Sequence, residues 1–117
     1  MSNREAPGDR TELLQGTLDL MVLRTLEAMG PQHGYAIASR LSQVSNGAIQ
    51  LNMGTLYPAL VRLELRGLIR ARWKTTDNHR RARYYELSAA GRRQLEAEKA
   101  GWERMTGIIE RMLSCDY

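Results

Sequence analysis

The chain has 117 residues, a length that predicts one domain with one modest core and that favours a dimer, since small domains are often marginal as monomers. Its apolar fraction of 43% is ordinary, the absence of Phe argues against a large aromatic-lined pocket, and a net charge of +4 is only weak evidence for an anionic partner. A single Cys excludes an internal disulfide and a cysteine-based zinc site. No apolar run is long enough to span a membrane, and the first ten residues lack the apolar segment of a secretory leader, so we expect a cytoplasmic protein without a metal or cofactor.

The first half of the chain predicts a polar arm, two helices and a short strand. Residues 1–10 are polar and predict a flexible arm. Apolar residues at helical spacing predict a first helix from Leu13 that ends at Gly30, and a second helix over 34–44. Residues 48–51 predict one small strand.

A third helix is predicted over 54–64, and two starts for it are open. With Thr55 as the N-cap, Pro58 lies in the first turn, where proline is tolerated. With Asn52 as the N-cap, Pro58 is interior and leaves the carbonyl of Gly54 without a donor. We expect a start between these two, with a distorted first turn. The inward positions, at i, i+4 and i+7, are Leu56, Leu60 and Leu63.

The second half predicts a β-hairpin and a long last helix. Residues 68–75 and 83–87 predict two strands joined by a turn at 76–79. Ser88 then caps a helix that runs to about Ser114; at ~1.5 Å per residue it is ~40 Å long, too long to pack wholly on a domain this small. Its apolar residues recur seven apart, which predicts packing on a partner helix, at Leu95, Trp102 and Ile109 and at Met105 and Met112.

Three helices followed by a β-hairpin form a winged helix-turn-helix domain, a mainly α fold with a small β wing. In that fold the third helix enters the major groove of DNA, and the hairpin tip reaches the backbone or the adjacent minor groove. Residues 62–83 hold eight Arg or Lys against two acids, a local charge of +6, which is the electrostatic footprint of a nucleic-acid binder. We therefore expect a DNA-binding domain over 11–87 and a dimerisation helix over 88–117.

Candidate DNA contacts lie on the third helix, at the start of the second helix and on the wing. Hydroxyl groups at a helix N-terminus meet base edges and phosphates, and arginines reach phosphates, guanine edges or the minor groove. The expected contacts are Thr55, Tyr57, Pro58, Arg62, Tyr35, Lys74, Arg80, Arg81 and Arg83.

Three motifs resemble those of PadR-like transcriptional regulators. Residues 54–64 (GTLYPALVRLE) resemble the recognition helix of that family, and residues 33–37 (HGYAI) resemble its signature at the start of the second helix. Residues 83–91 (RYYELSAAG) resemble its junction between wing and last helix. The motifs occur in the family's order, and the resemblance covers roughly residues 14–113.

The resemblance implies a homodimeric repressor of a palindromic operator, from the small subfamily with one C-terminal dimerisation helix. In some members a tryptophan of the last helix lies at the dimer interface and stacks on flat aromatic ligands. Trp102 resembles that residue, and with Leu20 and Asp19 it forms a candidate site for a small aromatic effector. The expected dimer interface consists of Leu13, Leu20, Leu95, Trp102, Met105, Ile109, Met112 and Leu113. The wing departs from the family at His79 and Ala82, where glycine and lysine are common.

Other interpretations remain open at this point. The domain is alternatively a winged-helix adaptor whose basic wing binds an acidic protein partner. Tyr57 is alternatively a partly buried core residue, and Trp102 a dimer residue that needs no ligand. An enzyme is not expected, because the chain has no Ser/His/Asp or Cys/His arrangement, no phosphate loop and no paired carboxylates in an apolar setting.

Overall fold

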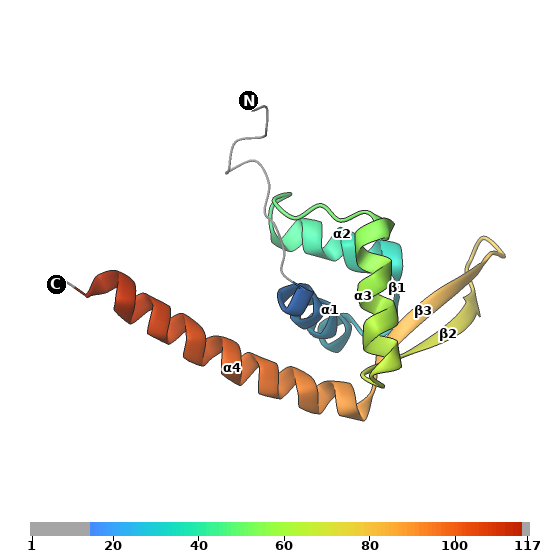
Figure 1. Ribbon diagram of the computed structural model, residues 1–117. Coiled ribbons are helices and arrows are strands. Elements are labelled where there is room, and N and C mark those ends of the chain that lie inside the picture. The colour runs from blue at the N-terminus through green and yellow to red at the C-terminus, as the bar shows by residue number, and fades with distance from the viewer. Residues whose placement is uncertain (1–14, 116–117) are drawn as a thin grey trace.

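The computed structural model describes residues 15–115, which form four helices and a small sheet (Figure 1). In chain order the elements are α1 (Gln15–Met29), β1 (Gln32–His33), α2 (Gly34–Val44), α3 (Met53–Leu65), β2 (Ile69–Thr75), β3 (Arg81–Leu87) and α4 (Ala89–Ser114). This order confirms the expected winged helix-turn-helix fold. The arm over 1–10 and the interface residue Leu13 lie outside the described residues.

The helices after α1 each begin at a side chain that accepts a backbone N–H three residues further on. The accepting residues are His33, Asn52 and Ser88, and the donor nitrogens lie 3.2, 2.9 and 3.0 Å away, respectively. Such caps satisfy N–H groups that have no partner within the helix. Ser88 is therefore confirmed as the cap of the last helix.

The start of α3 differs from the intermediate start that the sequence suggested. Asn52 is the N-cap, and its backbone carbonyl accepts the N–H groups of both Thr55 and Leu56. Asparagine is a stronger N-cap than threonine, which accounts for the earlier start. Pro58 consequently lies inside the helix and has no N–H to offer the carbonyl of Gly54. Gly54 is exposed, so water can bind that carbonyl.

The sheet has the order β1-β3-β2, with both pairs antiparallel. At its base Ile69 pairs with Leu87 and both are buried, whereas towards the tip Trp73 pairs with Arg83 and the strands leave the body. The turn residue His79 has a φ of 60°, a left-handed conformation in which glycine is common.

The strand expected over 48–51 is wrong, because the structure has a loop there. The alternation that suggested a strand is present, since Ile49 and Leu51 pack against the core while Ala48 and Gln50 are exposed. A strand also needs a free edge, however, and the edge of β3 that faces away from β2 is occupied by β1. The loop is held instead by the Ser45 hydroxyl, which accepts the N–H of Ile49 at 2.9 Å.

One core joins all four helices to the base of the sheet. Its largest fully buried side chains are Val22, Leu23, Leu26, Ile37, Leu56, Leu60, Leu63, Ile69 and Leu95. Leu95 was expected at a dimer interface, but its side chain is 0% exposed within its own chain. The interface assignment of Leu95 is therefore corrected, because a side chain sealed in the core cannot contact a partner.

The first turn of α4 is fixed against the turn between α3 and β2. The Ser88 hydroxyl donates to the carbonyl of Gly67 at 2.7 Å, and the Ser88 N–H donates to the carbonyl of Leu68 at 3.1 Å. Gly67 has a φ of 75°, which ends α3 and turns the chain into β2. A Cβ atom on Gly91 would collide with the carbonyl oxygen of Leu68 and would approach Leu87 to 2.7 Å. From this joint α4 passes α1 and continues beyond the helical body (Figure 1).

Replacing Gly91 with Ala is expected to lower the free energy of unfolding by about 1–3 kcal/mol, the usual effect of an added methyl group in a packed site. Gly107→Ala in the same helix is the control, because its Cβ would meet only the end of the Arg111 side chain, at 3.7 Å. That control is expected to raise stability by up to about 1 kcal/mol through helix propensity. Urea denaturation followed by circular dichroism at equal protein concentration measures both. Equal stabilities for the two variants would contradict the close packing at Gly91.

Candidate nucleic-acid interface

A hollow of about 1010 Å³ lies between α3, the start of α2 and the β2–β3 wing. It brings together residues that are far apart in the chain. Its aromatic lining is Tyr35, Tyr57, Trp73, Tyr84 and Tyr85, and its basic lining includes Lys74, Arg80, Arg81 and Arg83. Six of the nine expected DNA contacts therefore line this one surface, and the other three, Thr55, Pro58 and Arg62, belong to α3.

The face of α3 beside the hollow is polar and accessible. Thr55, Tyr57 and Pro58 are exposed, and Tyr57 retains 48% of its surface, so it is not a core residue. The opposite face of α3 is buried in the core and carries Leu56, Ala59, Leu60 and Leu63. This division leaves the first two turns of α3 free to contact another molecule.

Three cations of the wing lie over aromatic rings, and two of them, Lys74 and Arg81, have no acidic partner among the described residues. Nζ of Lys74 is 5.2 Å from the ring centre of Tyr84, and Cζ of Arg81 is 5.1 Å from the ring of Trp73. Within residues 15–115 neither cation forms an ion pair, and neither does Arg80. Cation–π contacts restrain such side chains without neutralising their charge, so these cations remain available to an anion.

Arg62, expected to contact DNA, is instead turned toward α1. Its Nη2 donates to Oδ1 of Asp19 at 3.0 Å, and the Asp19 side chain is only 7% exposed. The Nε of Arg62 is also buried and has no hydrogen-bond partner. Because a buried carboxylate without a counter-ion is costly, this pair favours the observed rotamer. Arg62 therefore fixes α3 to α1, and we leave it out of the proposed DNA contacts.

Arg83 is engaged in a similar way, although it lines the hollow. Its Nη2 lies 3.1 Å and 3.0 Å from the two carboxylate oxygens of Glu64, which joins β3 to the end of α3. Beside it, burial raises the pKa of the Tyr85 phenol, and the Arg83 guanidinium opposes that rise. Tyr85 is therefore a neutral group in the floor of the hollow at physiological pH.

Sequence reasoning missed the acids that hold these two arginines and the aromatic lining from the sheet. Asp19 and Arg62 are 43 residues apart, and no local pattern connects them. Arg70 and Arg72 also counted toward the basic window, but both pair with Glu86, at 3.5 and 3.3 Å, and neither lines the hollow. Arg70 and Arg72 are two residues apart on β2 and so lie on one face of the sheet, where both can reach Glu86 on β3. This two-residue spacing is the signal in the sequence that could have indicated the pairing.

A second hollow, of about 350 Å³, lies between α1 and α4. Its lining is Gly16, Thr17, Leu20, Glu98, Gly101, Trp102 and Met105. Two of the three candidate ligand-binding residues, Leu20 and Trp102, thus meet at one site. Asp19 does not line it, because its carboxylate is committed to Arg62, and it is removed from the candidate ligand site.

Residues 15–115 contain no group of three His, Cys, Asp or Glu side chains that could hold a metal ion. In the same range no helix is long and apolar enough to cross a membrane.

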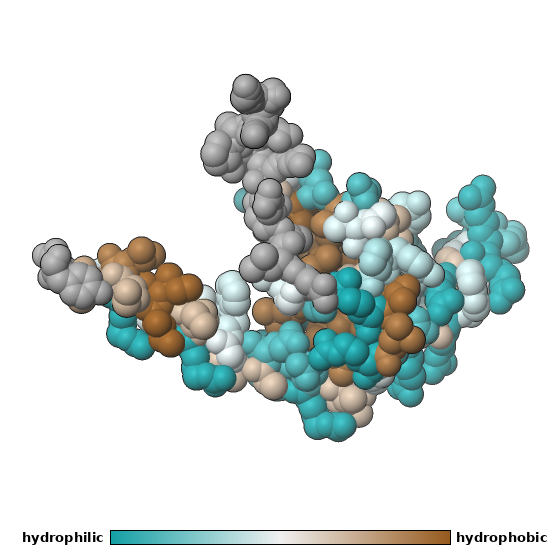
Figure 2. All heavy atoms as spheres, viewed as in Figure 1, coloured by the Kyte–Doolittle hydropathy of each residue, from teal (hydrophilic) through white to brown (hydrophobic). Residues whose placement is uncertain are grey.

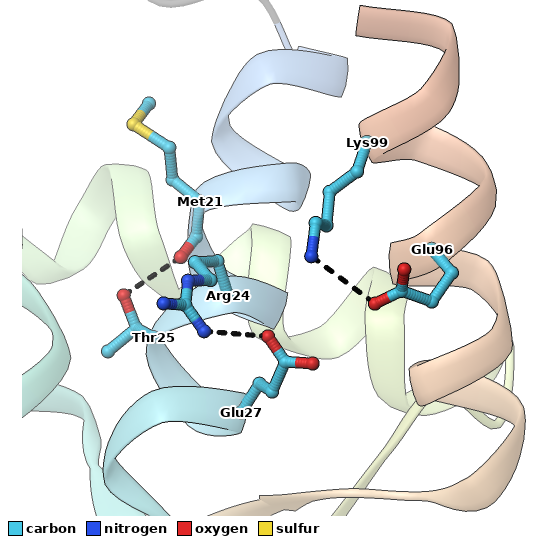
Figure 3. A network of polar contacts seen from close by, with 6 residues as sticks. All are labelled: Met21, Arg24, Thr25, Glu27, Glu96 and Lys99. Carbon is cyan, nitrogen blue, oxygen red and sulfur yellow. Dashed lines mark hydrogen bonds and ion pairs between the residues drawn. The ribbon is translucent and has the colours of Figure 1, made fainter. Parts of the chain in front are cut away.

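Short-range polar contacts lie within α1 and within α4, outside the hollow beside α3 (Figure 3). Nη1 of Arg24 lies 2.7 Å from Oε1 of Glu27, and the Thr25 hydroxyl donates to the carbonyl of Met21 at 2.8 Å. On α4, Lys99 pairs with Glu96 at 3.3 Å. The Arg24–Glu27 contact is shorter than Arg62–Asp19, but Arg24 is 61% exposed, so water screens it.

Asp19→Ala is expected to lower the free energy of unfolding by about 1–3 kcal/mol, because it leaves the half-buried Arg62 guanidinium without its carboxylate. Glu27→Ala removes the shorter but exposed pair and is expected to cost less than about 0.5 kcal/mol. Chemical denaturation of the two variants compares them directly. A larger loss for Glu27→Ala would show that Arg62–Asp19 does not fix α3.

Comparison with known proteins identifies the fold and the family. The family model described as "Transcriptional regulator PadR-like family" matches residues 22–97. A PadR family transcriptional regulator from Eggerthella lenta is 29% identical, covers 87% of this chain and 86% of its own, and superposes with a TM-score of 0.76. A transcriptional regulator from Clostridium thermocellum is 25% identical with a TM-score of 0.75 over 83% of this chain and 93% of its own. A PadR-like regulator from Bacillus cereus shares the fold, with 24% identity and a TM-score of 0.77 over 91% of this chain and 100% of its own.

A relative in sequence is the "Uncharacterized 37.1 kDa protein in transposon TN4556" of Streptomyces fradiae, which is 41% identical over 90 residues. The match covers 77% of this chain but only 24% of the relative, so the chain spans about a quarter of the length of that protein. The family match, in contrast, spans more than half of the 117 residues. The chain therefore belongs to the PadR-like family of transcriptional regulators.

Proposed function

We propose that this chain is a homodimeric repressor that binds a palindromic operator in double-stranded DNA. One observation carries the proposal. The exposed start of α3 and the uncommitted cations of the wing, Lys74, Arg80 and Arg81, border one continuous hollow. A helix end and a basic hairpin that border one concave surface suit a duplex, whose major groove takes the helix while the hairpin meets the backbone.

Within this proposal the side chains divide into two groups. Thr55, Tyr57 and Pro58 on α3 face base edges, where hydroxyl and apolar contacts carry sequence information. Lys74, Arg80 and Arg81 meet phosphates, which fix the orientation of the protein on the duplex without reading sequence. Tyr35 lies at the start of α2, is exposed and borders the same hollow, so we assign it a backbone contact.

An acidic protein partner is the less favoured occupant of this surface. The wing carries its free cations on a hairpin that extends from the body, the shape that reaches along a groove. The family to which the chain belongs consists of transcriptional regulators, which supports DNA as the partner.

The second half of α4 supports a homodimer. Beyond the body this helix exposes large apolar side chains, which gather on its projecting part (Figure 2). They are Trp102, Met105, Ile108, Ile109, Met112 and Leu113, each between 46% and 82% exposed. Trp102, Met105, Ile109 and Met112 follow the 3-4-3 spacing of a helix that packs on another helix. We propose that α4 of one protomer pairs with α4 of its partner and places the two α3 helices on successive major grooves.

The hollow between α1 and α4 supports a small aromatic effector as part of this proposal. Its volume of about 350 Å³ lies at the low end of the range for small-molecule sites. Gly101 lines it beside Trp102, and the missing side chain there leaves room next to the indole ring. Gly107 does not line it, and a Cβ atom there would meet only the end of the Arg111 side chain, at 3.7 Å. We propose that a flat ligand stacks on Trp102 at this site and relieves repression.

Arg81→Ala is expected to weaken binding to every duplex and to reduce the slope of log K against log salt by about one, because one phosphate contact is lost. Arg70→Ala is the matched control, since it removes the same charge from a side chain that pairs with Glu86 outside the hollow. Tyr57→Ala is expected to reduce, in addition, the preference for duplexes selected from a random pool. Fluorescence anisotropy at several salt concentrations measures all three. Equal effects of Arg81→Ala and Arg70→Ala would contradict the assigned surface.

Ile109→Glu is expected to convert the dimer to a monomer, because a buried carboxylate would face the partner helix without a counter-ion. Arg104→Glu changes the charge of the same helix on its opposite side and is expected to leave the dimer intact. Sedimentation velocity at micromolar concentration distinguishes the two states. A parent protein that sediments as a monomer would contradict the α4 interface itself.

A further inference from the structure

Trp73 lies on the wing and is not part of the hydrophobic core. It is paired with Arg83 in the register of β2 and β3, beyond the buried base of the sheet, and its side chain is 55% exposed. It borders the same hollow as Tyr57 and Arg81. A tryptophan exposed to this extent offers a large apolar surface to solvent, and such residues are enriched where a protein contacts another molecule.

Two arginines hold the indole ring in place. Cζ of Arg81 is 5.1 Å from the ring centre and Cζ of Arg83 is 5.9 Å from it. Arg83 is itself fixed to α3 through both oxygens of Glu64. The ring is therefore restrained relative to α3 although it lies on the hairpin. Arg81 differs from Arg83, because it forms no ion pair in the described part of the chain.

We propose that Trp73 is a DNA-contacting residue of the wing. Its ring packs on the deoxyribose surface of the backbone strand that lies between α3 and the wing, and it holds the Arg81 guanidinium toward the neighbouring phosphate. The inference rests on the proposed DNA binding and specifies how the wing takes part in it. A restrained ring beside a free guanidinium matches the backbone, which presents an apolar sugar and an anionic phosphate at each nucleotide.

This arrangement favours the backbone over stacking on a base. Bases in a duplex are already stacked, and a side chain must unstack them at a cost of a few kcal/mol to insert between them. A ring restrained by Arg83 through Glu64 is also not free to turn into such a wedge. Because the backbone carries no sequence code, Trp73 contributes equally to selected and random duplexes.

The chain contains two tryptophans, Trp73 and Trp102, so Trp73→Phe leaves Trp102 as the only indole. A duplex of random composition and about 24 base pairs, long enough for two successive grooves, is added at low salt, and anisotropy of a label on the DNA confirms saturation. The tryptophan emission of the parent is expected to be quenched or shifted on binding, whereas that of Trp73→Phe is expected to change little.

Equal changes in the parent and in Trp73→Phe would assign the signal to Trp102 and overturn the inference, and so would an unchanged parent emission at saturation. Failure of the parent to bind the duplex is a distinct result, which would overturn the proposed DNA binding together with this inference.

A double-variant comparison tests whether Trp73 and Arg81 act as one contact. Trp73→Ala and Arg81→Ala are each expected to weaken binding about fivefold to tenfold, as expected for a backbone contact that includes a cation–π pair. The double variant is expected to be less than about threefold weaker than either single variant, because residues that share a contact are not additive. If the loss of affinity in the double variant equals the product of the losses in the two single variants, Trp73 does not position Arg81. Far-ultraviolet circular dichroism of each variant verifies that the fold is retained.

Discussion

The joint between the end of α3, the base of the sheet and the start of α4 fixes the geometry on which every other feature depends. Ser88 accepts the N–H of Gly91 and donates to the carbonyl of Gly67, so one hydroxyl both caps α4 and ties it to the turn that ends α3. The absence of a side chain at Gly91 lets the helix lie directly on the backbone of Leu68. Because the proposed recognition helix, the wing and the proposed dimer helix all leave this joint, their mutual angles are set there.

The arginines of the basic half divide into structural and uncommitted groups. Arg62 and Arg83 pair with Asp19 and Glu64, and each has a buried Nε without a hydrogen-bond partner. They hold α3 against α1 and against β3, and their charges are largely neutralised there. Arg81 lies over the ring of Trp73, as Arg83 does, but it forms no ion pair in the described part of the chain and keeps its charge. A net charge is therefore only weak evidence for an anionic partner, and the pairing in three dimensions identifies the cations that can meet one.

Much of the fold could be predicted from the sequence, because local physics determines it. Apolar periodicity located the helices, and Ser88 before an apolar run located the start of α4. The missed features depend on long-range contacts. β1 is a strand only because β3 passes beside it, and the partner of Arg62 lies 43 residues away. Leu95 and Trp102 share a heptad position, yet the body ends between them, so one is sealed in the core and the other is half exposed.

The change from buried to exposed apolar side chains along α4 also suggests how the proposed effector site and the proposed dimer helix are coupled. The first half of α4 packs on its own chain through Leu95, and the second half presents an apolar face beyond the body. The hollow bordered by Leu20, Gly101 and Trp102 lies where the first half passes into the second. A ligand in this hollow would contact α1 and α4 together, and α1 is joined to α3 through Asp19 and Arg62. In the proposed dimer, a ligand that binds one arrangement of these helices more tightly than another would shift the population toward that arrangement, and this is how the proposed effector would change the spacing of the two α3 helices without contacting DNA.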